Sequence, residues 1–232
     1  MLIATAIVGA MRPFRFGVQS FEFKDPVELG ERAAWIEALG YDELFTHDHV
    51  GTAMSQDPVD PFIPLMVAAA ATTTLRVGPL VTNNELHEPA LLARTAATVD
   101  RMTSGRLTLG MGTGYARVEH DAIGVRLLDP PERVTRFGES LRVLRDLFDE
   151  GSCHMDGEYH EIDLADIGVR PVQERLPFLV GGHGRRVVRL AAEFADIFQF
   201  TGLTHDPDGT LTGSGFGLDH ILQRADWLSA DA

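Results

Sequence analysis

Residues 91–114 contain a helix, a turn and a strand in direct succession: Leu91-Leu-Ala-Arg-Thr-Ala-Ala-Thr-Val-Asp-Arg-Met-Thr-Ser-Gly-Arg106-Leu-Thr-Leu-Gly-Met-Gly-Thr-Gly114. We expect the helix at 89–102 and the strand at 106–111. Three glycines at alternate positions follow the strand, where backbone without side chains could approach a ligand closely. This stretch sets the pattern for the rest of the chain.

The same alternation extends toward the N-terminus. Asp25 is suited to cap a helix whose first residue is Pro26, and Gly40 follows the end of that helix. The elements expected on this side are a strand at 14–21, a helix at 25–38, a strand at 41–46, a helix at 61–73 and a strand at 75–82.

The alternation also continues toward the C-terminus. A long helix at 131–150 carries apolar residues on one helical face, among them Phe137, Leu141, Leu144, Leu147 and Phe148. The elements expected after it are a strand at 177–180, a helix at 185–194, a strand at 195–200 and a helix at 218–228.

Alternating strands and helices predict parallel strands joined by crossover helices, and therefore an α/β fold. Polar or glycine-rich segments follow nearly every strand, which favours a TIM-type (β/α)8 barrel over a doubly wound sheet. Six strands are expected where such a barrel has eight. The sequence could be a fragment, the gene could end early, or a partner could complete the sheet. We expect an N-terminal extension at 1–12 and one barrel domain at 13–232, incomplete at its C-terminus.

Composition limits the function. With 232 residues, 44% of them hydrophobic, the chain can bury one core. A formal charge of −14 argues against nucleic acid and anionic membranes as partners. The chain has no apolar run of transmembrane length and no basic residue before its short apolar start, so we expect a cytoplasmic protein. Cys153, the single cysteine, excludes an internal disulfide. We expect it in a polar turn, where it is a weak candidate nucleophile.

The segment Thr46-His-Asp-His-Val50 follows the second strand and contains the first candidate site. Side-chain alternation would place His47 and His49 on one side and Asp48 on the other. The histidines could bind a metal, although no later strand offers further ligands and we expect none. They could instead be hydrogen-bonded loop residues, or one could transfer a proton beside a cofactor.

Two further segments carry unusual glycines. Val77-Gly-Pro-Leu-Val-Thr-Asn83 places Gly-Pro inside a strand, which predicts a bulge, either for packing alone or as a backstop for a planar ring. Leu109-Gly-Met-Gly-Thr-Gly-Tyr115 is Gly-x-Gly-x-Gly and differs from the dinucleotide fingerprint. The second motif alone is weak evidence for nucleotide binding.

The last candidate is an anion site. Leu176-Pro-Phe-Leu-Val-Gly-Gly-His-Gly184 leads directly into a helix that begins with Arg185 and Arg186. Free N–H groups at a helix start, glycines before it and arginines beside it would suit a phosphate. The alternative is an ordinary strand-to-helix turn with solvated arginines.

Taken in this order from Phe14 to Phe200, these segments resemble the luciferase-like superfamily of flavin and coenzyme F420 enzymes. Residues 91–114, and Arg170-Pro-Val-Gln followed by Pro177 and Gly181-Gly182, are the most typical. The resemblance implies a barrel with the cofactor ring across its C-terminal mouth, packed on a non-prolyl cis peptide between Pro79 and Leu80. The implied cofactor-binding residues are Asp48, Pro79, Leu80, Thr82, Gly112, Gly114, Gly181, Gly182, His183, Gly184 and Arg185.

In the deazaflavin branch, the histidine of an Asp-His pair after the second strand handles the proton. Asp48-His49 matches that pair, so the resemblance makes His49 the catalytic residue, and Gln19 is expected to face the substrate pocket or fill the mouth. We therefore expect a homodimeric F420-dependent oxidoreductase acting on a small molecule. The alternatives are an FMN-dependent monooxygenase supplied by a flavin reductase, an inactive barrel remnant and a metal hydrolase. Family members carry two further strands, which puts cofactor binding by this chain alone in doubt.

Overall fold

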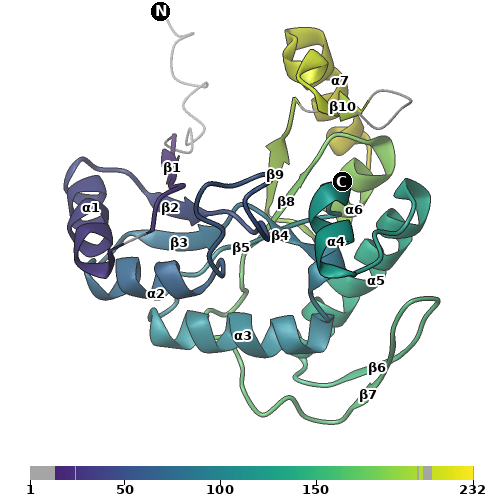
Figure 1. The fold of residues 1–232 in the computed structure, drawn as a ribbon. Helices are drawn as coiled ribbons and strands as arrows, with labels where there is room; N and C mark the ends of the chain where they lie inside the picture. The colour runs from purple at the N-terminus through teal and green to yellow at the C-terminus, as the bar shows by residue number, and fades with distance from the viewer. Residues whose placement is uncertain (1–13, 24, 203, 206–210, 232) are drawn as a thin grey trace, which may run out of the picture.

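The computed structural model describes residues 14–23, 25–202, 204–205 and 211–231 (Figure 1). The predicted extension at 1–12 lies outside these residues.

Two parallel sheets form the centre of the molecule. The first has the order β1-β2-β3, with β1 at Gly17–Gln19, β2 at Glu43–Thr46 and β3 at Arg76–Pro79. The second has the order β4-β5-β8-β9, with these strands at Thr82–Asn83, Leu109–Gly112, Phe178–Gly182 and Ile197–Phe200. A bridge between Val77 and Leu107 joins the sheets, so the strands form one arc. No pairing between β1 and β9 is present among the described residues, so the arc is open there.

Most helices follow a strand and pack along the outside of the arc, whereas the last helix packs on the one before it and the short helix at Arg117–Ile123 reaches the loop after the second strand (Figure 1). Asp25 caps the first of them by accepting hydrogen bonds from Val27 N and Glu28 N, as predicted. Asp129 and Glu132 form a capping box at the start of α5. The helices are α1 (Pro26–Ala38), α2 (Ile63–Ala70), α3 (Pro89–Met102), α4 (Arg117–Ile123), α5 (Pro130–Asp149), α6 (Arg185–Phe194) and α7 (Leu218–Asp231).

The core lies between the strands and this layer of helices. Phe137 and Leu144 from α5, Leu109 from β5 and Phe178 from β8 are fully buried. The short elements outside this framework are the 3-10 helices η1 (Asn84–Leu86) and η2 (Ser214–Phe216) and the paired strands β10 (Thr204–His205) and β11 (Leu211–Thr212). No helix in the described part of the chain combines the length and apolar character needed to cross a membrane.

The predicted third strand, 75–82, is not continuous. It breaks into β3 and β4 at Leu80–Val81, which is also where the structure places a cis peptide bond. The prediction that this bond joins Pro79 and Leu80 was therefore wrong by one residue. Proline at 79 lies within β3, and the chain crosses from one sheet to the other after it.

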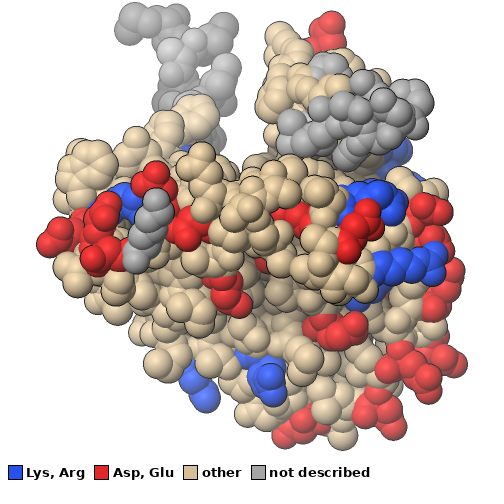
Figure 2. All heavy atoms as spheres, in the orientation of Figure 1, with Lys and Arg blue, Asp and Glu red and all other residues tan. Residues whose placement is uncertain are grey.

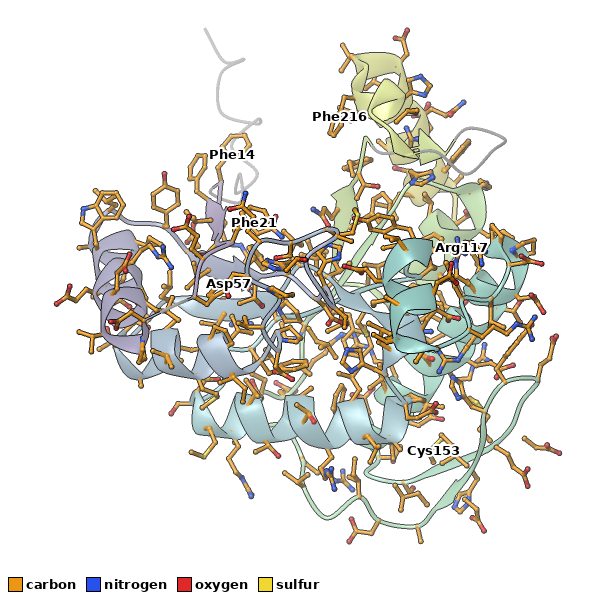
Figure 3. All side chains as sticks on the ribbon, viewed as in Figure 1. Phe14, Phe21, Asp57, Arg117, Cys153 and Phe216 are labelled. Atoms are coloured by element: carbon orange, nitrogen blue, oxygen red, sulfur yellow. The ribbon has the colours of Figure 1, made fainter. Side chains whose placement is uncertain are left out.

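The prediction of a polar turn at Cys153 was also wrong. Cys153 begins β6 (Cys153–Asp156), which pairs antiparallel with β7 (Glu161–Leu164), and its side chain is buried against the core. Burial and the nearby Asp146 carboxylate raise the pKa of the Cys153 thiol. Figure 3 shows Cys153 on the lower side of the molecule, opposite Phe21 and Arg117. Both observations argue against a nucleophilic role.

Candidate active site

The carboxyl ends of the parallel strands lie on one side of the arc and bring the predicted sites to a common face. Loops after β2 and β5, the break before β4 and the end of β8 all contribute to it. Phe21, which follows β1, and Arg117, which follows β5, mark this face in Figure 3. We call it the mouth, as in barrel enzymes, where loops from many strands form the active site.

His49 lies at the mouth in a close pair with Glu119 of α4. Its Nδ1 is 3.0 and 3.1 Å from the two carboxylate oxygens of Glu119. The Glu119 side chain is 1% exposed and that of His49 is 20% exposed, so the pair is buried on the glutamate side and reachable on the histidine side. Both described hydrogen bonds of His49 end at Nδ1, which leaves Nε2 without a partner among the described residues.

Aromatic rings hold the His49 ring from two sides. The His47 ring centroid is 5.6 Å from that of His49, as expected for side chains on one side of the segment, and Tyr115 meets His49 edge-on at 6.1 Å. Phe21 stacks on His47 at 5.3 Å. This row of rings, with the Glu119 carboxylate, fixes the plane of the His49 imidazole.

His47 is itself buried and hydrogen-bonded. Its Nε2 lies 2.7 Å from Ser55 Oγ, while its Nδ1 is buried without a hydrogen-bond partner. Burial, and then the neighbouring His49, lower the pKa of His47. Burial and the Glu119 charge raise the pKa of Tyr115. Neither His47 nor Tyr115 is therefore charged near neutral pH.

Asp48 connects two segments of the mouth. Its Oδ2 accepts hydrogen bonds from Asn83 N and His87 Nε2, each at 2.8 Å. Asn83 belongs to β4, so the carboxylate fixes the backbone immediately after the cis peptide bond. Both described bonds end at Oδ2, and Oδ1 is the oxygen left for a ligand.

The chain between β3 and β4 is fixed from both sides. Leu80 N donates to Thr46 O at 2.7 Å, and Gln19 Nε2 donates to Leu80 O at 2.9 Å. Gln19 therefore supports the bulge, which agrees with a residue that fills the mouth. The Thr82 hydroxyl donates to Gly110 O at 2.8 Å and is fully buried. The single hydroxyl hydrogen of Thr82 is therefore used inside the sheet.

Glycines surround the bulge because larger residues would not fit there. A Cβ on Gly112 would lie 2.8 Å from Val81 Cγ2, and one on Gly181 would lie 3.2 Å from Val81 Cγ1. A Cβ on Gly110 would overlap the Pro79 carbonyl oxygen. Gly114 has a positive φ of 72° and its Cβ would overlap the Asn83 side chain. The absence of side chains at Gly112 and Gly181 thus leaves room for the Val81 side chain beside β5 and β8.

The predicted anion site is at the start of α6. Gly184 is the N-cap and offers no side chain to the first-turn N–H groups. A Cβ on Gly184 would meet nothing within 4 Å, so the loop is open at this point. Arg185 follows it, with a half-exposed side chain directed toward α7.

Comparison with known proteins identifies the family. Residues 8–211 match the luciferase-like monooxygenase family. This chain belongs to the luciferase-like monooxygenase family. The match covers every strand of the arc and the whole mouth.

Three relatives illustrate the similarity. The F420-dependent glucose-6-phosphate dehydrogenase of Nakamurella multipartita is 31% identical over 193 residues, which cover 82% of this chain and 56% of the relative. The 5,10-methylenetetrahydromethanopterin reductase of Archaeoglobus fulgidus is 28% identical, with 78% and 51% covered. The crystal structure of monooxygenase RslO1 from Streptomyces bottropensis has a TM-score of 0.75 at 20% identity, with 94% and 67% covered. The chain thus spans about half the length of the curated relatives it matches.

The predicted luciferase-like TIM-type barrel is confirmed by these relatives, with an arc that is open among the described residues. Sequence reasoning missed Glu119, the residue closest to the catalytic candidate. It also missed His87 and Asn83, which bind Asp48. The only available signal for Glu119 was an acidic residue shortly after the glycine-rich segment 109–115.

No group of three or more His, Cys, Asp or Glu side chains arranged to hold a metal occurs among the described residues.

A groove of about 360 Å³ lies away from the mouth, between α5 and α6. Arg142, Arg186 and Arg189 line it together with Glu139 and Glu193. None of the residues of the mouth contributes to this groove. Acidic side chains gather instead over α1, at the left of Figure 2.

Proposed function

We propose that this chain is an oxidoreductase that uses the deazaflavin coenzyme F420 for hydride transfer to or from a small organic substrate. Two curated relatives support the proposal, namely the F420-dependent glucose-6-phosphate dehydrogenase and the methylenetetrahydromethanopterin reductase. Because the chain spans about half of each relative, their substrates are not assigned to it.

The residues of the mouth fit a planar cofactor with an anionic tail. Val81 fills the space beside Gly112 and Gly181, and its half-buried side chain offers an apolar surface at the mouth on which a flat ring can pack. Asp48 Oδ1 can accept a hydrogen bond from the polar edge of such a ring. The open N–H groups at the start of α6, after Gly181-Gly182-His183-Gly184, can bind a phosphate.

The observation that carries the proposal is the pair of His49 and Glu119. A carboxylate on Nδ1 fixes the orientation and tautomer of the ring, while Nε2 stays available for proton transfer. A histidine held in this way at a barrel mouth is suited to proton transfer coupled to hydride transfer.

The roles of the chain's own residues follow from this geometry. When bound, the deazaflavin supplies a carbon that accepts or donates hydride. His49 Nε2 takes the proton from a substrate hydroxyl, or returns it in the reverse direction. Glu119 keeps Nδ1 protonated and the ring in place, and Phe21, His47 and Tyr115 limit water on one side of the imidazole.

The test is a fluorescence titration of the purified chain with coenzyme F420 and, in parallel, with FMN. Saturable binding that favours F420 is expected. Preference for FMN would instead place the chain among the monooxygenases that need a flavin reductase. Binding of neither by a folded chain would contradict the proposal and favour an inactive barrel remnant. A homodimer and a cytoplasmic location stay predictions, and sedimentation would check the first.

A further inference from the structure

The helix α7 lies on the loop that we propose to bind the cofactor phosphate (Figure 1). Arg224 of α7 is 5% exposed, and its Nε donates to His183 O at 3.0 Å. Its Nη1 donates to His220 O, within α7, at 2.8 Å. This buried guanidinium therefore connects α7 to the backbone of the loop.

A second arginine connects the two helices from the other side. Arg185 Nη2 lies 3.1 Å from Asp231 Oδ1, and its Nη1 lies 2.6 Å from Asp231 Oδ2. The same Nη1 donates to Trp227 O at 3.2 Å, and the guanidinium lies 5.5 Å from the Trp227 ring centroid. The Arg185 side chain is 46% exposed and that of Asp231 is 19% exposed.

Arg185 thus makes one hydrogen bond to Asp231, from Nη2 to Oδ1, and a close charge contact with Oδ2, and the same guanidinium nitrogens can bind a phosphate. Arg185 is the first residue of α6, so its positive charge belongs to the same segment as the open N–H groups of that helix. While Asp231 holds it, the positive charge of Arg185 is neutralised, and a carboxylate repels an approaching phosphate.

We propose that Asp231 is an internal competitor of the cofactor phosphate for Arg185. Phosphate binding then requires Arg185 to exchange the Asp231 carboxylate for the ligand, while Arg224 keeps α7 on the loop. This inference rests on the proposed phosphate role of the loop 181–185 and adds a regulatory contact to it.

The competition is weak enough to be overcome. The Arg185 side of the ion pair is half exposed, so solvent screens the interaction, which stabilises the docked helix only slightly. Removing the competing charge is therefore expected to strengthen anion binding by roughly two- to five-fold, the range of exposed ion pairs. A more highly charged phosphate can displace the carboxylate without unfolding α7.

The experiment compares Asp231→Asn with Asp226→Asn in the full chain. Asp226 is exposed on the same helix and forms no described ion pair, so its replacement gives the same change in net charge without freeing Arg185. Each variant and the wild type are titrated with coenzyme F420 and, separately, with inorganic phosphate. Fluorescence follows the cofactor titration, and tryptophan fluorescence follows phosphate through Trp227. Circular dichroism verifies the fold of each variant.

Tighter binding of both probes by Asp231→Asn, relative to Asp226→Asn, is expected, with the difference shrinking at high salt. Equal affinities for these two variants would overturn the inference. If Arg185→Ala also weakens binding in that case, the phosphate role of the loop stands without the competitor. Failure of all variants to bind either probe would contradict both the proposed function and the inference.

Discussion

The two ends of the proposed cofactor site are built differently. At the β2 end, Glu119 is nearly inaccessible and pairs with His49 through both oxygens. At the β8 end, Arg185 is half exposed and pairs with Asp231 on a separate helix. The first end holds its carboxylate within the folded core, whereas the second keeps its guanidinium half in water.

This difference follows from solvation. A charge removed from water interacts strongly with its neighbours, and leaving its partner unpaired is costly. Removing His49 would therefore leave the buried Glu119 carboxylate without its partner, at a large cost in free energy. A half-exposed guanidinium retains water and loses little when its partner changes. Substitutions should consequently have large effects at the β2 end and small effects at the β8 end.

The largest effect is expected for His49→Ala. If His49 Nε2 transfers the proton, turnover should fall by roughly 10²- to 10⁴-fold while F420 affinity stays close to that of the wild type. Glu119→Gln should lower turnover less, because the amide oxygen can still accept a hydrogen bond from Nδ1 and orient the ring, although the second carboxylate oxygen is lost. Steady-state kinetics with a reactive substrate and F420 titrations measure both quantities. Unchanged turnover of His49→Ala would remove the catalytic assignment.

The sequence predicted only some of the features at the β2 end. Asp25 and Pro26 predicted the start of α1, and the Asp48-His49 pair predicted the catalytic candidate, because caps and short motifs are local. The partner of His49 is 70 residues away along the chain, on a helix of seven residues that the periodicity did not predict. Contacts of that range depend on how the strands assemble.

The bulge shows the same limit. Gly78-Pro79 indicated an irregular strand, but the position of the break depends on where the chain passes from β3 to β4 in the other sheet. The contacts of Arg185 were also out of reach, because they require the placement of α7. The sequence predicted which residues could bind an anion, and only the fold showed that one of them already has a carboxylate.

A smaller effect, on stability, should separate the two ends through their glycines. Gly110→Ala places a Cβ against the Pro79 carbonyl oxygen in the packed sheet and should lower the free energy of unfolding by about 1–3 kcal/mol. Gly184→Ala, in the open loop, should cost less than about 1 kcal/mol, because its Cβ meets nothing and only N-cap preference is lost. Urea denaturation measures both. Equal losses would contradict the assignment of one packed end and one open end.

The smallest expected effect is the pH dependence that His47 gives to the β2 end. Burial lowers its pKa in the folded state, so the unfolded chain takes up a proton at this residue first as the pH falls. The stability associated with neutral His47 is therefore complete above the unfolded pKa of about 6.5 and declines below it, by at most about 1.4 kcal/mol per pH unit. His47→Gln should flatten the free energy of unfolding between pH 7.5 and 5. His160, whose pKa burial also lowers, lies beside α5 and away from the mouth, so His160→Gln should flatten the profile as well and serves as the reference for a buried histidine elsewhere in the fold. If His160→Gln flattens the profile and His47→Gln does not, the mouth is more hydrated than its buried imidazole indicates, and the contrast between the two ends weakens.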